Sequence, residues 1–188
     1  MDESPKQLIG SIRADRPMGK AKEKRQDYEY VRHGVCNIFM ANEPLKGRRY
    51  VRITDRKTKR DWAMFIKELA DEHYPEAETI YLVMDNLKTH TPSALYEVFE
   101  PPEAKRIWDR FRFVYTPKHG SWLNMAEIEL NVLQGQCLNR RIDKKEEIES
   151  EVQAWTMARN RLDAKINWQF TTKDARIKLK RLYPSFDA

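Results

Sequence analysis

The chain has 188 residues, which suits one ordinary domain with a hydrophobic core. A hydrophobic content of 40% argues against disorder. No apolar run approaches the roughly 18 residues of a membrane span, and the first ten residues are neither basic nor apolar enough for a signal peptide. The net charge of +6 fits a polyanionic partner, although charge alone is a weak signal. Cys36 and Cys137 lie far apart and outside any CxxC pattern, which favours reduced thiols over a metal site.

The amino-terminal half alternates predicted strands with one clear helix. Residues 11–27 are charged and carry Pro17 and Gly19, which indicates an exposed loop or a flexible hairpin. Apolar residues recur at helical spacing over 61–74, and Pro75 ends this amphipathic helix. In chain order we expect a polar start over 1–10, one or two strands over 28–41 broken at Gly34, a strand over 48–55, the helix over 61–74 and a strand over 79–84.

The carboxyl-terminal half is mostly helical. One strand interrupts the helices, and the last predicted helix is short and basic. Strands and helices that alternate in this way predict an α/β fold. In chain order we expect helices over 93–99 and 102–110, a strand over 111–115, and helices over 124–139, 144–162 and 172–182.

An acid follows directly after the most apolar predicted strand. Residues 80–84 have strong β propensity, and Asp85 comes next. Because α/β sheets bind ligands in the crevice beyond the carboxyl ends of their strands, Asp85 is a candidate site residue. The alternative is an Asx-turn made by Asp85 and Asn86 after the strand.

A second acid lies in the first turn of the helix that is predicted to begin at Asn124. Asn124 and Glu127 have the spacing of a capping box, so capping alone explains their positions. A carboxylate in a first helical turn is also well placed beside a metal ion, and the two roles are compatible. Glu129 is the next candidate if Glu127 is only a cap, although it points about 200° around the helix.

The other polar candidates are less distinctive by themselves. Asp2 and Glu3 lie in a polar amino terminus, which is normally frayed. His90 is more often a surface or packing residue than a ligand, and His119 belongs to a Pro/Gly turn. The cations near the carboxyl terminus suit either a solvated helix face or the phosphates of DNA.

Four segments together resemble the catalytic domain of DDE transposases, in the insertion-sequence family 630 branch of the mariner-like superfamily. The segments are MDESPKQLIG at 1–10, VMDNLKTH at 83–90, YTPKHGSWLNMAEIE at 115–129 and INWQFTTKDARIKLKRLYP at 166–184. They occur in the same order as in that family and extend over essentially the whole chain.

The resemblance implies an RNase H-like α/β fold, in which helices flank a mixed sheet and the last third is mostly helical. By position, it implies that Asp2, Asp85 and Glu127 are the catalytic and metal-binding residues. It also implies two Mg²⁺ ions, with Mn²⁺ as a substitute, held by carboxylates. The residues expected to support this site are Asn86, His90 and Asn124.

The resemblance further implies a partner and a location. The partner is DNA, both transposon ends and target, and a homodimer is compatible with the family. The implied location is the bacterial cytoplasm, with nucleoid association when DNA is bound. The residues expected to contact DNA, as a basic patch around the acidic site, are Lys118, His119, Arg140, Arg141, Lys178, Lys180 and Arg181.

The chain departs from the family at its amino terminus. Family members have apolar strand residues before the first Asp and a helix-turn-helix domain further upstream, and neither precedes Asp2 here. We therefore expect a single domain over 1–188 that is truncated at its amino terminus, with a shortened first strand. That strand is central in an RNase H-like sheet, so its neighbours would be left with unpaired backbone groups.

Three functions follow from these observations. The first is a transposase catalytic domain that cleaves DNA strands and transfers them in the transposition of an insertion sequence. The second is an inactive remnant that acts at most as a basic DNA-binding or dimerising module. The third is another RNase H-like nuclease that acts on structured nucleic acid.

Overall fold

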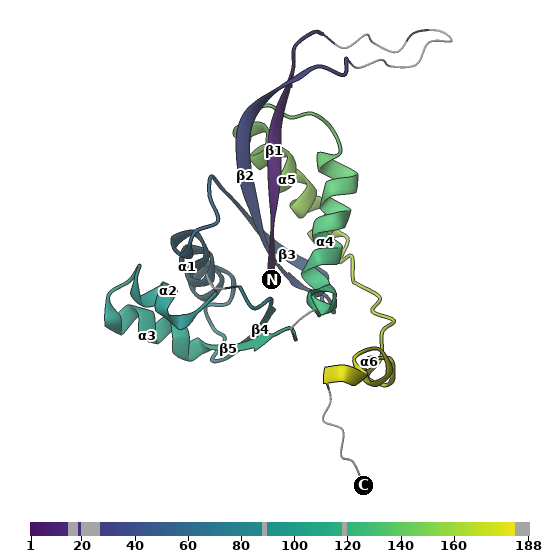
Figure 1. Cartoon of the computed structure of the whole chain (residues 1–188). Helices are drawn as coiled ribbons and strands as arrows, with labels where there is room; N and C mark the ends of the chain where they lie inside the picture. The colour runs from purple at the N-terminus through teal and green to yellow at the C-terminus, as the bar shows by residue number, and fades with distance from the viewer. Residues whose placement is uncertain (15–18, 20–26, 88–89, 118–119, 183–188) are drawn as a thin grey trace.

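The computed structural model describes residues 1–14, 19, 27–87, 90–117 and 120–182. Three of its strands form an antiparallel sheet with β2 in the middle, and two form a parallel pair (Figure 1). The strands are β1 (Asp2–Ser11), β2 (Tyr30–Glu43), β3 (Arg48–Thr54), β4 (Ile80–Met84) and β5 (Phe111–Tyr115).

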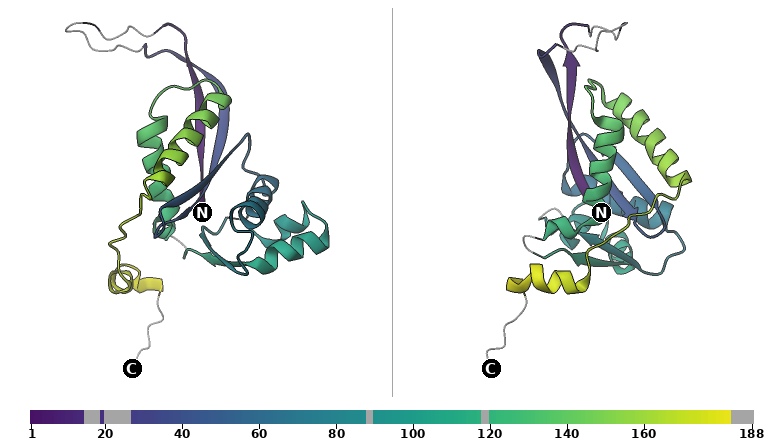
Figure 2. Two further views of the ribbon diagram at one scale, coloured as in Figure 1. Left: turned by 180° about the vertical axis from the view of Figure 1, so that it is seen from behind. Right: turned by 90° about the vertical axis from the view of Figure 1, so that its right-hand side faces the viewer.

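Helices lie on both faces of the antiparallel sheet. α4 and α5 pack on one face, while α1 lies on the other face together with α2, α3 and the β4–β5 pair (Figures 1 and 2). α1 and α4 each continue into a π-helical turn, Leu69–His73 and Gln134–Leu138 respectively. Among the described helices, none has the length and apolar character needed to cross a membrane. The helices are α1 (Lys59–Glu68), α2 (Pro92–Tyr96), α3 (Pro101–Arg110), α4 (Met125–Leu133), α5 (Lys145–Arg161) and α6 (Thr172–Lys178).

β2 holds the two halves of the core together because both of its faces are buried. Successive residues of a strand point to opposite faces. Ile38 and Met40 therefore join the cluster formed with α4 and α5, whereas Phe39 and Ala41 join the cluster formed with α1 and β4. The apolar run in β2 thus contacts both layers of helices, one on each face of the strand.

The β1–β2 hairpin is longer than its sequence predicts. β2 runs without a break through Gly34, and β1 is a regular strand of ten residues from Asp2 onward. The register shifts between Leu8 and Ile9, which leaves His33 without a partner opposite β1. Gly34 has φ of 117°, a conformation that residues with a side chain rarely adopt, so glycine allows the bulge here instead of ending the strand.

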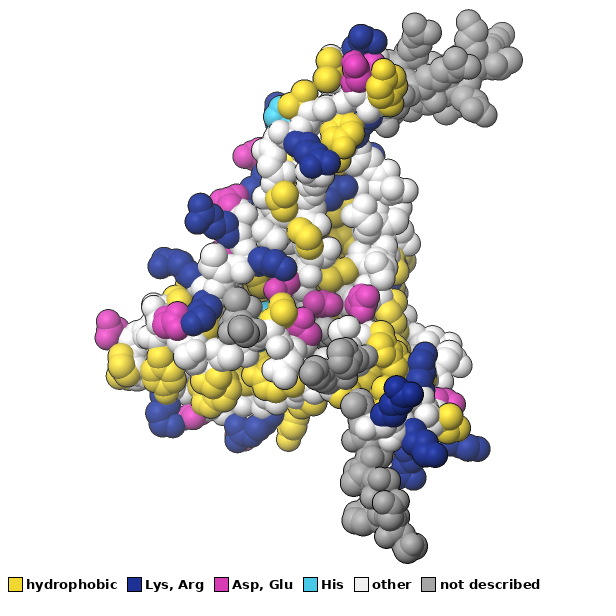
Figure 3. Space-filling model, in the orientation of Figure 1, with side chains coloured by type: hydrophobic (Ala, Val, Ile, Leu, Met, Phe, Trp, Pro, Cys, Tyr) yellow, Lys and Arg dark blue, Asp and Glu magenta, His cyan; other side chains and the backbone are white. Residues whose placement is uncertain are grey.

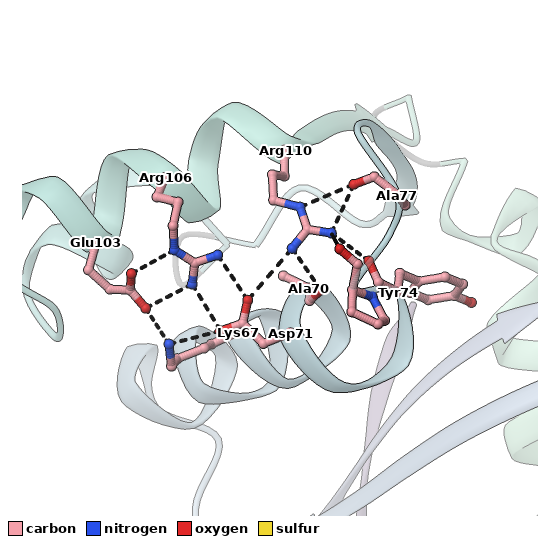
Figure 4. A network of polar contacts seen from close by, with 9 residues as sticks. Lys67, Ala70, Asp71, Tyr74, Ala77, Glu103, Arg106 and Arg110 are labelled. Atoms are coloured by element: carbon pink, nitrogen blue, oxygen red, sulfur yellow. Dashed lines mark hydrogen bonds and ion pairs between the residues drawn. The ribbon is translucent and has the colours of Figure 1, made fainter.

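Ion pairs join α3 to the end of α1. Arg106 forms ion pairs with Asp71 and Glu103, and Glu103 also pairs with Lys67 (Figure 4). Arg110 donates to backbone carbonyls at the π-helical turn and beyond it, at Ala70, Tyr74, Pro75 and Ala77. This network holds α3 against the end of α1 and the segment that leads to β4.

The structure confirms an α/β fold, but the described strands form two sheets and not one mixed sheet. The strands at 80–84 and 111–115 are confirmed. Within the described strands, residues 41–43 of β2 pair only with β3, and β4 pairs only with β5. A groove of about 310 Å³ lies between these two strand edges.

Candidate functional site

Asp2 and Asp85 meet where the two sheets adjoin. Asp2 opens β1, and Asp85 directly follows β4. The Met1 nitrogen donates a hydrogen bond to the carbonyl oxygen of Val83 at 2.5 Å, which brings the start of β1 beside the end of β4. Acidic side chains gather in this region, near the middle of the face shown in Figure 3. Two of the three predicted acids are therefore neighbours, although 82 residues separate them in the sequence.

The environment of Asp2 disfavours its charged form. Burial raises the pKa of Asp2 to about 6, and the negative charge of Asp85 adds to this rise. The Glu3 backbone N–H donates to Asp2 Oδ1 at 2.8 Å and opposes the shift in pKa only in part. A carboxylate in this state gains from a nearby cation, because the cation offsets both the burial and the repulsion.

His90 lies behind Asp85 and is buried. Its Nδ1 atom is 2.9 Å from Asp85 Oδ1, and its Nε2 atom is 2.9 Å from Glu3 Oε2. The ring also stacks on Trp62, with centroids 5.7 Å apart. His90 thus bonds to Glu3 and lies against Asp85, and its role in support of the site stays a prediction.

Asn124 ties the start of α4 to the start of β1. Its side-chain nitrogen donates to the Met1 carbonyl at 2.7 Å, and its side-chain oxygen accepts from the Ala126 N–H at 3.2 Å. Glu127 lies in the first turn of this helix, and its side chain is exposed. The Asn124 N–H bonds to the Ser121 carbonyl, so the cap at this helix start is a single one and not the capping box that the spacing predicts.

Asn86 and the Asx-turn alternative are less well defined. Asn86 is exposed beside Asp85. The turn that follows includes residues 88–89, which lie outside the described part of the chain, so the Asx-turn remains open.

Two of the three predicted metal ligands, Asp2 and Asp85, offer oxygen atoms suited to a hard divalent cation. Asp85 Oδ1 is buried and has no hydrogen-bond partner of good geometry in the described chain. Asp2 and Asp85 together offer the oxygen ligands that Mg²⁺ prefers. Among the residues that the structure describes, however, no group of three or more acidic, histidine or cysteine side chains is close enough to hold a metal ion. Of the three predicted ligands, Asp2 and Asp85 lie together, and Glu127 is linked to them through the start of its helix, where Asn124 bonds to the Met1 carbonyl.

The predicted basic patch is not one surface around the acidic site. Arg141 bonds to Ser11 Oγ, at the end of β1 that lies roughly 30 Å from Asp2. Arg140 is paired with Glu147 and Glu151 on α5. Arg141 is therefore held at the far end of the hairpin, outside a patch around the acidic site, whereas Arg140 is paired on α5, and its contact with DNA stays a prediction.

The cations near the carboxyl terminus lie closer to the start of α4. Lys178 Nζ is 4.5 Å from the centre of the Trp122 ring, in the turn just before Asn124. Lys180 and Arg181 follow in a short 3₁₀ turn and are exposed. Lys and Arg side chains gather over α6 in Figure 3. Lys118 and His119 lie outside the described residues.

Sequence reasoning missed two buried acids. Glu3 was assigned to a frayed terminus, but it forms part of β1 and bonds to His90. Glu129 is paired with Arg49 from β3 and Arg159 from α5, in the core behind α4. No periodicity or spacing links these residues; only the pairing of acids with distant basic residues in three dimensions reveals them.

Comparison with known families assigns the chain to one of them. Residues 1–149 match the model of the DDE superfamily endonucleases, so the chain belongs to that family. This membership suggests a nuclease of the transposase type, which acts on DNA. The match ends within α5, so the resemblance of residues 166–184 lies outside it. Neither the curated proteins nor the solved structures include a significant match.

Proposed function

We propose that this chain is the catalytic domain of a transposase that cleaves and transfers DNA strands during the transposition of an insertion sequence. The observation that carries the proposal is the meeting of Asp2 with Asp85 between the two sheets, with the pKa of Asp2 raised to about 6. Family membership over residues 1–149 supports the same reaction class. The fold that we propose is RNase H-like, with β1, β2 and β3 as its antiparallel part.

The chain's own residues would perform two tasks in this reaction. Asp2 and Asp85 would bind divalent cations, Mg²⁺ or Mn²⁺, and Glu127 would complete the ligand set once DNA or metal draws it in. When bound, such a pair of ions activates the attacking oxygen and stabilises the leaving oxygen of a phosphodiester. Asn124 would fix the helix that presents Glu127 through its bond to the Met1 carbonyl.

DNA would approach over the start of α4. Lys178 lies against Trp122 just before this helix, Lys180 and Arg181 follow it in the chain, and the three would contact phosphates without reading sequence. A bacterial cytoplasmic location at the nucleoid, and assembly as a homodimer on transposon ends, belong to the same proposal.

A plasmid-nicking assay tests this function. The purified chain is incubated with supercoiled DNA in Mg²⁺ or Mn²⁺, and conversion to the nicked circle is followed on a gel. We expect nicking that EDTA stops and that Asp85→Asn lowers by at least about 100-fold, while the Arg141→Ala variant nicks like the parent because Arg141 lies at the far end of the hairpin.

The inactive-remnant alternative has its own support, because no three-acid group is formed among the described residues. It predicts a folded chain that binds DNA and Mn²⁺ but leaves the plasmid intact. That outcome would reject the catalytic proposal and retain the family.

A further inference from the structure

The strongest feature that the proposed reaction leaves unused is a cluster of three aromatic side chains beside the start of α4. Trp122 lies in the turn before α4, and Trp168 and Phe170 lie in the segment between α5 and α6. All three are half-buried. In the described structure, none of the three belongs to a hydrophobic core cluster or packs against one, whereas the remaining tryptophans do. The core therefore does not explain why three large rings gather here.

The three rings meet edge to face. The ring centroids of Trp122 and Phe170 are 4.9 Å apart at an interplanar angle of 83°, and those of Phe170 and Trp168 are 6.2 Å apart at 76°. Gln169, between Trp168 and Phe170, is exposed, which is the alternation that an extended segment gives. In neither pair are the rings stacked face to face, so each pair leaves ring faces that the partner ring does not cover.

Exposed cations follow directly after the rings. α6 buries none of its residues, and its one acid, Asp174, is bonded to Thr171 in a capping box. Lys178 Nζ lies 4.5 Å from the centre of the Trp122 ring. A polyanion is therefore the partner whose charge complements this segment. The exposed cations from residue 172 to residue 182 are Lys173, Arg176, Lys178, Lys180 and Arg181.

The rings lie between these cations and the acidic pair. Trp122 precedes Asn124 by two residues, and the Asn124 side chain bonds to the carbonyl of Met1, the neighbour of Asp2. In Figure 3, apolar side chains gather over the start of α4, between the acidic side chains and the cations of α6. A strand of nucleic acid that contacts both the acids and the cations would therefore pass over the rings.

The segment that carries Trp168 and Phe170 is held against the rest of the chain. The Ile166 N–H donates to the Pro44 carbonyl at 3.1 Å, and the Arg49 guanidinium donates to the Ala164 carbonyl. α6 begins directly after Phe170, at the capping box of Thr171. The rings are therefore placed by contacts on both sides of them. The segment also lies beyond residues 1–149, so the family match assigns it no role.

We propose that Trp122, Trp168 and Phe170 bind unpaired bases of DNA beside the acidic pair, while the cations of α6 hold the phosphates of the same strand. This inference rests on the proposed function, because it takes DNA as the substrate. Aromatic rings beside cations suit a single strand, since every base has a face that can stack on a ring. In a duplex those faces are covered by the neighbouring base pairs, so only an unpaired segment can use the site.

The alternative is that the rings only anchor α6 to the start of α4. Anchoring alone predicts that the loss of a ring loosens α6 and weakens the binding of single-stranded and duplex DNA by the same factor. Stacking predicts a loss for the single strand only. The kind of DNA whose binding changes therefore separates the two ideas.

The test measures affinities for DNA by fluorescence anisotropy, with EDTA present so that no strand is cut. Three labelled probes of about 12 nucleotides are compared: a single strand of thymidines, a strand of the same length that carries abasic sites, and a duplex. The abasic strand keeps the phosphates and lacks the bases, so it removes stacking alone. We expect the parent to bind the abasic strand about 10-fold more weakly than the intact strand.

Trp168→Leu should bind the intact strand about 10-fold more weakly than the parent does, and it should no longer distinguish the intact strand from the abasic one. Its affinity for the duplex should stay that of the parent, because the phosphate contacts are unchanged. Trp168→Phe keeps a ring and should recover most of the loss. Trp155→Leu is the matched control, because Trp155 is also half-buried beside a cation, Arg159, but on α5. It should leave all three affinities unchanged.

Melting temperatures and circular dichroism establish that each variant is folded. Equal losses for single strand and duplex in the folded Trp168→Leu variant, or parental binding of the intact strand, would overturn the stacking role. Equal affinities of the parent for the intact and abasic strands would also overturn it, and that comparison needs no variant. A parent that stacks bases in this way but leaves plasmid DNA intact would reject the catalytic proposal and retain this inference. A parent that binds none of the probes would reject DNA as the partner, and both proposals with it.

Discussion

Glu127 and Glu129 lie two residues apart on α4, and the same substitution is expected to have opposite consequences at the two positions. Glu129 is 2% exposed and paired with Arg49, which is 1% exposed. Burial alone would raise the pKa of Glu129, but Arg49 and Arg159 lower it overall. Glu127 is exposed. Glu129→Gln should therefore damage the fold, and Glu127→Gln should damage only the reaction.

The magnitude at Glu129 follows from burial. Removing one partner of a buried ion pair costs about 3–5 kcal/mol, because the other charge is left uncompensated. Gln keeps an oxygen that can accept from Arg49 Nε, which places the expected loss near 3 kcal/mol. In a domain of this size about 1 kcal/mol corresponds to 2–4 °C, so the melting temperature should fall by roughly 6–12 °C. Glu127→Gln should change the free energy of unfolding by less than about 0.5 kcal/mol.

Urea unfolding followed by tryptophan fluorescence measures both values, and equal slopes against urea would show that the unfolded states are comparable. Replacing both Arg49 and Glu129, with Arg49→Met and Glu129→Leu together, should recover part of the loss, because the one charge then left without its partner is that of Arg159, which is less buried than Arg49. An unfolding free energy for Glu129→Gln within about 0.5 kcal/mol of the parent would refute the reasoning. Plasmid nicking by Glu127→Gln at the parental rate would show that Glu127 is not a ligand.

Three further outcomes are expected. Arg106 and Lys67 lower the pKa of Glu103 to about 2. The contribution of Glu103 to stability is therefore present above about pH 4.5 and is lost as the pH falls toward 2. Glu103→Gln should remove that part of the acid sensitivity, about 1 kcal/mol after solvent screening, and melting temperatures at pH 2–6 measure it. DNA affinity should fall steeply as salt rises, and Lys178→Ala should reduce the slope of log affinity against log salt by about 1 in a shift assay. Arg141→Ala should leave this slope unchanged, because the Arg141 guanidinium is already bonded within the hairpin. Gly34→Ala should destabilise the chain by about 1–2 kcal/mol through the positive φ of this residue alone, since no atom lies near the added methyl group. Gly135→Ala is the control, because that position is equally open but has no positive φ. Equal melting temperatures for the two variants would contradict the argument.

Local pattern was enough to predict the elements that bury one regular face. The strands after Thr79 and Arg110 are short apolar runs, and the structure places both within one residue of the predicted bounds. The amphipathic helix after Thr58 was also predicted, and its capping box with Asp61 explains where it begins. The fold class followed from the order of these elements.

Features that depend on distant partners could not be predicted in this way. Glu3 looked like part of a frayed end because its own segment is polar, but pairing with β2 makes that segment a strand. The Arg49–Glu129 pair joins residues 80 positions apart and leaves no local trace. Only the family resemblance predicted that Asp2 and Asp85 lie close together. The residues at the start of one strand and at the end of another do not show, by themselves, which strands will lie side by side.

The division into two sheets has a consequence for how the acidic pair is held. Asp2 belongs to the antiparallel sheet, and Asp85 follows a strand of the parallel pair. They are therefore held near each other by the Met1–Val83 hydrogen bond and by the core that contains Phe39, Trp62 and Met84, and not by the hydrogen-bond ladder of a single sheet. A cation bound to both carboxylates would link the two sheets and would reduce their motion relative to each other. Substitutions in the core between the two sheets would then change the affinity for the metal, although the substituted residues do not contact it.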